Sequence, residues 1–258
     1  MADLSMDSYW QLPAMARTAA TAAFALSICI HLGLVPGWWF VWYPRYLWMI
    51  PPQIWRFITS FLITGPKMGL LLDPYFLYSY MSQLEVNNPR FPRKEDMIWY
   101  LMFVGGTIMT LIYLSGFGFT SFLSALIVAM CYTTTQEQRG MKANYMVVTI
   151  PAQMAPYVML LMNLLFPGGA MNLLLQIHGL LAAHLFDFLT TIWPQYGGGK
   201  NLLPTPAFLT TVVGGFVAVH HRLAVALGLR SPYDVAPSGS GSAVADNWRA
   251  RGAGKRLG

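Results

Sequence analysis

Six long apolar stretches recur along the chain, and the shorter segments between them hold most of its charges. We predict spans at Ala14–Gly33, Lys67–Leu84, Met97–Ser115, Phe119–Thr135, Tyr145–Phe166 and Met171–Trp193. None of them alternates like a strand, and roughly 20 apolar residues in a helix cross a hydrocarbon core of about 30 Å. Because lipid leaves backbone polar groups without water, the pattern predicts an all-α polytopic membrane protein with six transmembrane helices.

Two of the stretches depart from the ideal pattern. The second follows a break at Gly65-Pro66 and is interrupted again at Asp73-Pro74, and the fourth has only 17 residues. An outer-membrane barrel would instead show segments of roughly ten alternating residues, and the chain has no such segments.

Composition and charge agree with a membrane protein and exclude an ordinary soluble domain. Of the 258 residues, 55% are hydrophobic and 10% are charged. With six spans, thirteen of the 16 basic residues fall on the side that holds both termini, whereas Arg45, Arg56 and Lys67 fall on the other. This asymmetry predicts that both termini are cytosolic. The net charge of +6 is therefore a signal of topology, and we expect no nucleic-acid partner.

The predicted organisation has four parts: a cytosolic N-terminus (1–13), a six-helix membrane domain (14–193), a juxtamembrane segment (194–233) and a disordered tail (234–258). The tail is rich in Pro, Ser, Gly and Ala. Ala207–Val219 is apolar but too short to cross a bilayer, so we expect it to rest on the cytosolic membrane surface.

The first predicted loop, Leu34–Pro66, is unusually aromatic. Around Arg45 it holds Trp38, Trp39, Phe40, Trp42, Tyr43, Tyr46 and Trp48, and near its end lies the pair Trp55-Arg56. Trp and Tyr collect at the boundary between lipid tails and headgroups. Two interpretations stay open, an aromatic belt that anchors the protein, or a rim that thins lipid beside a lateral opening.

Polar residues within the spans are candidates for function because their insertion is costly. His184 and Asp187 are three residues apart on the sixth span and share a helix face, so they form either an oriented general base or a structural pair. No Ser lies in a Gly-x-Ser-Gly motif, and we predict no catalytic residue, no metal site and no cofactor. Gly179 and Ala183 form a small-xxx-small pair, which predicts close helix packing.

The stretch from Gln53 to Leu62 (QIWRFITSFL), followed by Gly65-Pro66, resembles the Derlin family. Further resemblances follow in order at Tyr78–Glu85, Pro156, Asn163, Gly179, His184, Phe188-Leu189, Gly198–Asn201 and Thr205–Leu209. Together they cover about residues 14–210. The chain departs from the family where a second glycine of the sixth helix is replaced by Ala183.

The resemblance implies a rhomboid-like fold without protease activity. The His and Asn that active rhomboids use in the second span fall at Gly69 and Asp73. It also implies residence in the endoplasmic reticulum membrane and retrotranslocation in endoplasmic-reticulum-associated degradation, the route by which misfolded proteins reach the cytosol. Trp55, Arg56, Asp73, Asn163, His184 and Asp187 would then shape a lateral gate and a wet cleft for clients.

The implied partners are misfolded client proteins, a ubiquitin ligase complex, the valosin-containing AAA-ATPase and homo- or hetero-oligomers. The tail ends in a sequence similar to the short motif by which Derlins recruit that ATPase, with Gly252, Gly254 and Leu257 as the matching residues. Two other functional classes stay open, an active intramembrane serine protease using Ser121 or Ser124, and a transporter or channel for small solutes. The absence of an internal repeat disfavours the transporter.

Overall fold

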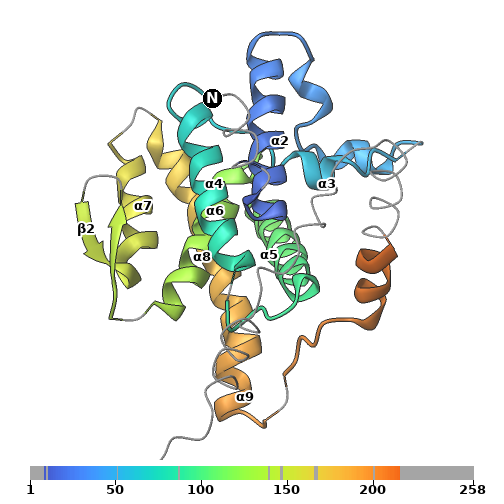
Figure 1. The fold of residues 1–258 in the computed structure, drawn as a ribbon. Helices are drawn as coiled ribbons and strands as arrows, with labels where there is room; N and C mark the ends of the chain where they lie inside the picture. Colours follow the sequence, from blue (N-terminus) through green and yellow to red (C-terminus); the bar gives the residue numbers. More distant parts are fainter. Residues whose placement is uncertain are drawn as a thin grey trace, which may run out of the picture. The chain divides into compact units, whose positions relative to one another are not determined.

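The computed structural model describes residues 9, 11–50, 52–86, 88–138, 140–145, 148–165, 168–199 and 201–215. Residues Met15–Thr210 form one compact unit (Figure 1). The described residues 9, 11–14 and 211–215 belong to a second unit with the two chain ends. The described part of the chain is mostly helical.

Each predicted span contains a helix. The main helices are α2 (Ala14–His31), α4 (Gly69–Glu85), α5 (Lys94–Ser115), α6 (Leu123–Glu137), α7 (Ala155–Asn163) and α8 (Gly169–Asp187), which continues in helical turns to Tyr196. With this continuation counted, the helix begins and ends within four residues of the predicted bounds for five of the six spans. α4 continues through Pro74, where only one backbone hydrogen bond is lost, near the start of the helix.

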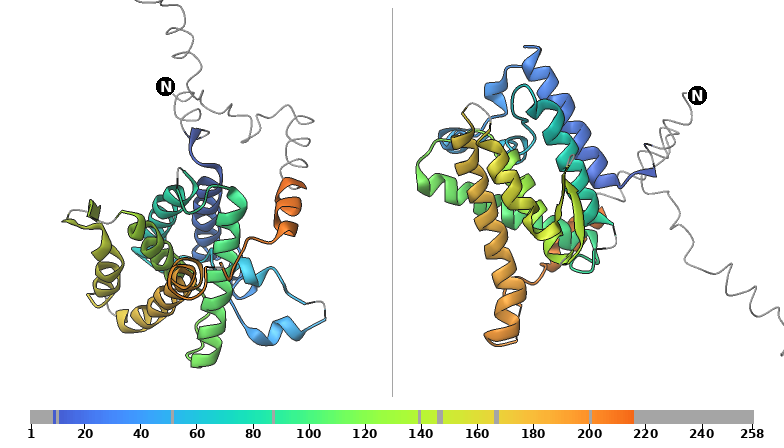
Figure 2. Two further views of the ribbon diagram at one scale, coloured as in Figure 1. Left: turned by 90° about the horizontal axis from the view of Figure 1, so that it is seen from below. Right: turned by 90° about the vertical axis from the view of Figure 1, so that its left-hand side faces the viewer.

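Three of these helices are long and apolar enough to cross a membrane: Ala14–His31, Lys94–Ser115 and the continuous helix Gly169–Tyr196. The last consists of α8, a π-helical turn η4 (Phe188–Ile192) and α9 (Trp193–Tyr196). The end of this helix at α9 projects beyond the other helices of the unit in Figure 1 and in the right-hand view of Figure 2. The remaining three helices are shorter, with 17 residues in α4, 15 in α6 and nine in α7.

The prediction was wrong for the first part of the fifth span, Tyr145–Phe166. This region begins in an antiparallel hairpin of β1 (Lys142–Tyr145) and β2 (Val148–Pro151), with Ala143 opposite Ile150. A 3-10 turn, η3 (Ala152–Met154), leads into α7. The β-branched run Val148-Thr149-Ile150 favours extended backbone, and Pro151 removes a donor that a helix would need. The fold is therefore mostly helical rather than all-α.

Between α2 and α4 the aromatic loop contains three short helical pieces: η1 (Gly37–Trp39), η2 (Pro44–Trp48) and α3 (Arg56–Thr59). Its backbone is hydrogen-bonded to the connection between α5 and α6, where the Trp42 amide donates to the Thr120 carbonyl at 2.8 Å. The Phe122 amide donates to the Ser60 carbonyl at 2.9 Å. The Trp42 ring packs against Phe57 and Phe122, so this loop is part of the folded unit.

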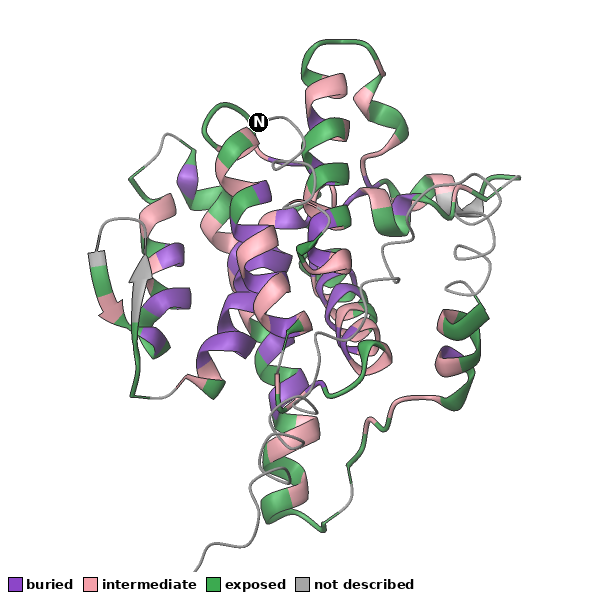
Figure 3. Ribbon diagram, in the orientation of Figure 1, coloured by how far each residue is buried: buried purple, intermediate pink, exposed green. Residues whose placement is uncertain are grey.

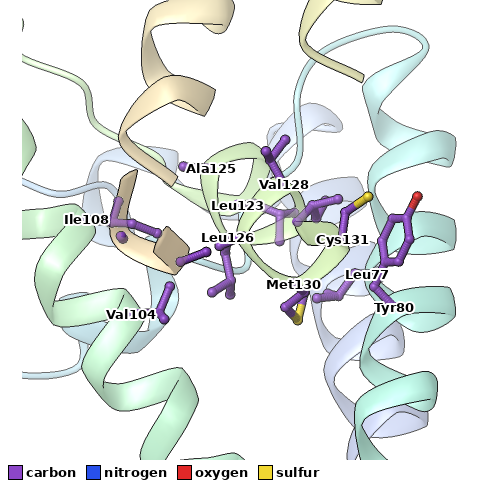
Figure 4. Close-up of a cluster of buried hydrophobic side chains, with 14 of the residues drawn as sticks. Leu77, Tyr80, Val104, Ile108, Leu123, Ala125, Leu126, Val128, Met130 and Cys131 are labelled. Atoms are coloured by element: carbon purple, nitrogen blue, oxygen red, sulfur yellow. The ribbon is translucent and has the colours of Figure 1, made fainter. Parts of the chain in front are cut away.

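α6 is the central helix of the unit. It packs against α4, α5, α7 and α8, and every residue from Ala125 to Thr135 is buried (Figure 3). Its side chains interdigitate with Leu77 of α4 and with Val104 and Ile108 of α5 in the core (Figure 4). A helix buried on all sides explains why its sequence shows no polar face.

Candidate functional site

Arg56 lies inside the aromatic loop rather than at its surface. Its side chain is fully buried, and Nε donates to the Gln53 amide oxygen at 2.6 Å. One terminal nitrogen donates to the Trp38 carbonyl at 2.7 Å and also to the Val41 carbonyl. The guanidinium stands over the Tyr46 ring, 4.6 Å from its centroid. One guanidinium thus holds together three separate parts of the loop.

Burial lowers the pKa of Arg56 from its ordinary value, yet a guanidinium stays charged at any physiological pH. Its second terminal nitrogen is buried and has no hydrogen-bond partner among the described residues. The neighbouring Trp55 is 39% exposed, and its indole nitrogen donates to the Trp39 carbonyl at 3.2 Å. Of the two residues, Trp55 is partly exposed at the surface of the loop, and Arg56 is buried and holds the loop backbone in position.

Asp73 lies in the first part of α4 and binds the turn that precedes the helix. Its Oδ2 accepts a hydrogen bond from the Gly65 amide at 2.7 Å. A Cβ atom on Gly69 would come within 3.1 Å of the same oxygen, so a glycine leaves room for this contact. Lys67, which lies between Gly65 and Gly69 in the sequence, adopts a positive φ of 58°, and a non-glycine residue rarely does so.

Asn163 joins α7 to α8 through an amide contact. Its Nδ2 donates to the Met159 carbonyl at 2.8 Å and to the Gln176 side-chain oxygen at 2.7 Å. Its Oδ1 accepts from Asn172 at 3.4 Å. Gln176 is 5% exposed, and the sequence pattern alone did not single it out. The sequence did contain a signal for Gln176, because it is a polar residue in an apolar span and lies at helical spacing from Gly179 and His184.

Asp187 pairs with Arg90 and not with His184. The carboxylate Oδ1 and an Arg90 terminal nitrogen are 2.6 Å apart. The same nitrogen lies 3.0 Å from the Thr190 hydroxyl and 2.9 Å from the Thr191 hydroxyl, both on the π-helical turn. Arg90 lies in the connection between α4 and α5. In the sequence it counted only as one of the thirteen basic residues on the side that holds both termini.

His184 is exposed and packs against an aromatic ring instead of a carboxylate. The centroids of its ring and the Tyr132 ring are 4.1 Å apart, with an interplanar angle of 48°. Tyr132 is buried on α6. The contact therefore joins the surface of α8 to the central helix.

Gly179 lies where α8 crosses α6 at very close range. A Cβ atom on Gly179 would be 2.0 Å from the Ala125 carbonyl oxygen, which is impossible without moving a helix. Ala183, one turn later, is fully buried. The small residues thus lie on the side of α8 that faces the core.

Several polar side chains join the same ends of successive helices. The Glu85 carboxylate, at the end of α4, accepts from the amides of Met15 and Ala16 at 3.0 and 2.9 Å, and so caps the start of α2. Gln138 beyond α6 donates to Gln83 at 3.0 Å. We call the end of the unit formed by Met15, Gln83, Glu85, Arg90, Asp96, Gln138, Asp187 and Thr205 the polar end.

The site residues named from the sequence therefore do not converge on one pocket in the described part of the chain. Trp55 and Arg56 belong to the aromatic loop, Asp73 binds the start of α4, and Asn163 joins α7 to α8. Asp187 belongs to the polar end. Gly252, Gly254 and Leu257 lie outside the described residues.

Comparison with known proteins agrees with the resemblance found in the sequence. The model of the Der1-like family matches residues 12–207. Human Derlin-1 is 32% identical over 216 residues, covering 81% of this chain and 82% of that protein. Derlin-1 of Arabidopsis thaliana is 30% identical over 214 residues, covering 80% and 76%. The DER1-like family member protein 1 of Saccharomyces cerevisiae is 25% identical over 246 residues, covering 84% and 70%.

The family match spans the aromatic loop, the polar end and every helix from α2 to α9. The order of motifs along the sequence and the apolar helices of the fold agree with it. The chain belongs to the Der1-like family and is a polytopic membrane protein.

Proposed function

We propose that this protein is a non-catalytic retrotranslocation factor of endoplasmic-reticulum-associated degradation. It engages misfolded proteins at the endoplasmic reticulum membrane and eases their passage to the cytosol. A ubiquitin ligase complex and the valosin-containing AAA-ATPase act with it, and it works as a homo- or hetero-oligomer. Family membership supports this role.

We further propose six membrane passes in a rhomboid-like arrangement with both termini in the cytosol. The polar end supports this topology because it brings together the start of α2, the end of α4 and the loop before α5. It also includes the ends of α6 and α8. Because α2 and α5 begin at this end whereas α4, α6 and α8 end there, the chain enters and leaves the same end of the unit in turn. The basic residues of the sequence concentrate on the same side.

The observation that carries the mechanism is the shortness of α7. Nine helical residues span about 13 Å, against a hydrocarbon core of about 30 Å. A bilayer next to so short a helix thins to cover it. Thinning shortens the apolar path that a polar polypeptide must cross, where each unsatisfied backbone group costs several kcal/mol.

The named residues then have two kinds of role. We propose that Trp55, Asp73, Asn163 and His184 contact clients or water along the thinned side. Arg56 and Asp187 act indirectly, since their hydrogen bonds are made to the protein itself. Gly179 and Ala183 keep α8 close to α6. The ATPase is recruited through Gly252, Gly254 and Leu257.

The protease alternative finds less support. The sequence lacks a Gly-x-Ser-Gly motif, and the His184 ring packs on Tyr132 while Asp187 binds Arg90. This is not the serine–histidine–carboxylate chain that acyl transfer needs. The small-solute transporter is disfavoured by the missing internal repeat.

The test is client turnover in cells that lack the protein. Re-expression of the wild-type chain should restore degradation of a misfolded lumenal client, with no cleaved client fragments when the proteasome is blocked. A Trp55→Ala, Arg56→Ala double variant should insert in the membrane but restore turnover poorly. Client fragments that disappear on Ser121→Ala or Ser124→Ala would instead establish the protease.

A further inference from the structure

The hairpin of β1 and β2 has a hydrogen-bonding pattern that fixes which backbone groups face outward. The Ala152 amide donates to the Met141 carbonyl at 3.0 Å, and the register continues this pairing along both strands. In an antiparallel ladder, residues that bond to the partner strand alternate with residues whose backbone groups point away from it. Ala143, two residues after Met141, therefore bonds to β2. The backbone groups of Lys142 and Asn144 point away from β2.

The two edges of the hairpin differ. β2 presents Thr149 and Pro151 outward, and Pro151 has no amide hydrogen to donate. β1 presents an N–H and a C=O at both Lys142 and Asn144. In the described part of the chain the sheet consists of these two strands, and no backbone hydrogen bond from another segment reaches the outward groups of β1. The outer edge of β1 is therefore a template on which a further strand can pair.

This edge lies at the surface and is stabilised by a partner. Lys142 is exposed, and Met141 before it is 58% exposed. Open sheet edges do not occur in hydrocarbon, so the edge faces water or headgroups until another strand pairs with it. Because a two-stranded hairpin is only marginally stable, a third strand adds hydrogen bonds where the sheet is weakest.

The chemistry and the position of the edge fit an extended polypeptide. The hairpin connects α6, which reaches the polar end through Gln138, to α7, the shortest of the main helices. A client that crosses the membrane along α7 would leave it near this hairpin. Misfolded proteins share no sequence, but every unfolded chain has backbone donors and acceptors, and pairing along an edge reads only these. The ammonium group of Lys142 favours an acidic side chain on the added strand.

We infer that the outer edge of β1 receives an extended segment of a misfolded client as a third strand, through the backbone groups of Lys142 and Asn144. The identity of this occupant rests on the proposed function, whereas the open edge rests on the fold alone. The apolar pattern of the sequence predicts a membrane span here, so only the tertiary structure reveals the edge.

Hydrogen exchange of the full-length protein in nanodiscs, measured amide by amide, tests the inference. The probe is reduced and carboxymethylated α-lactalbumin, which cannot fold, and native disulfide-bonded α-lactalbumin is its matched control. The unfolded probe should slow exchange of the Lys142 and Asn144 amides by about tenfold or more and leave Ala143, which is bonded within the hairpin, unchanged. The folded control should change none of the three.

Two results would overturn the inference. The first is equal exchange of the Lys142 and Asn144 amides with and without the unfolded probe. The second is equal slowing of these two amides and that of Ala143, because a contact without strand pairing does not alternate along the backbone.

A pair of variants separates the backbone from the side chain. Asn144→Pro removes an outward amide and keeps the ladder bonds of Ala143, whereas Asn144→Thr keeps the amide and favours a strand. The proline variant should lose the slowing at Lys142, and the threonine variant should retain it. Slowing that persists in the proline variant would contradict strand pairing. If slow exchange of Ala143 without the probe shows that Asn144→Pro has lost the hairpin, Lys142→Pro takes its place, with Asn144 as the reporting amide.

This test is separate from the turnover experiment. Protection of the edge by the unfolded probe, in a protein that fails to restore client turnover, would support the edge as a polypeptide-binding surface and contradict retrotranslocation. Restored turnover without protection would support retrotranslocation and overturn the role of the edge.

Discussion

Arg90 and Asp187, 97 positions apart in the sequence, form an ion pair with 2.6 Å between nitrogen and oxygen. Both side chains are 13% exposed. The pair joins the connection between α4 and α5 to the point where α8 becomes a π-helical turn. A guanidinium is suited to this position because it reaches Thr190 and Thr191 with the same group.

Replacing Arg90 with Gln should destabilise the protein markedly. The change leaves the Asp187 carboxylate without its cation in a largely buried position, at a cost of about 2–4 kcal/mol. Thermal unfolding of the purified protein in detergent measures the loss. The control is Arg93→Gln, whose side chain is 61% exposed beside Asp96 and should matter far less. Equal effects of the two substitutions would contradict a structural role for the Arg90 pair.

Replacing Gly179 with Ala should separate α8 from α6. The added methyl group would meet the Ala125 carbonyl oxygen at 2.0 Å, and accommodating it should cost about 1–3 kcal/mol. Gly106→Ala on α5 is the matched control, because a Cβ there meets nothing within 4 Å. By helix propensity the control should be neutral or stabilising by up to about 1 kcal/mol. A Gly179→Ala protein with an unchanged melting temperature would show that the crossing tolerates a wider spacing.

Replacing Arg56 with Lys should loosen the aromatic loop although the charge is kept. An ammonium group cannot reach Gln53, Trp38 and Val41 together in the plane that a guanidinium provides. Hydrogen exchange of the amides of residues 37–41 should accelerate by about tenfold or more. Arg45→Lys, at an exposed position of the same loop, should leave exchange as in the wild type. Unchanged exchange in both variants would mean that other contacts hold the loop.

Deleting Gly252–Gly258 should abolish co-purification of the valosin-containing AAA-ATPase. A short motif of this kind binds through a few residues that order on the partner, so its removal leaves no second contact. Deletion of the equally long segment Ser238–Val244 controls for tail length. Binding that survives loss of the last seven residues would show that the sequence similarity of the tail is accidental.

The positions of the helices could be predicted because long apolar runs identify them in any membrane protein. α2 and α5 agree with their predicted bounds to within three residues. The fifth span was wrong because hydropathy alone does not separate a buried helix from an apolar hairpin, although Val148–Pro151 carried a local signal for extended structure.

The candidate site was less accessible to sequence reasoning. His184 and Asp187 share a face of one helix, and pairing them used the only geometry that a sequence provides. The partner of Asp187 is instead Arg90, which is remote in the chain and becomes adjacent only when α5 and α8 pack together. Gln176 was overlooked for the same reason, since its significance depends on Asn163 of the neighbouring helix.

By itself the sequence determined that this chain enters a membrane, where most of its helices begin and end, and which family it resembles. These properties depend on local composition and on residue order. Only the tertiary structure decided that Arg56 is an internal support of its loop, that Asp187 binds Arg90, and that Gly179 touches Ala125. Each of these contacts depends on distances between segments that are remote along the chain, and such distances are fixed only by the packing of the helices.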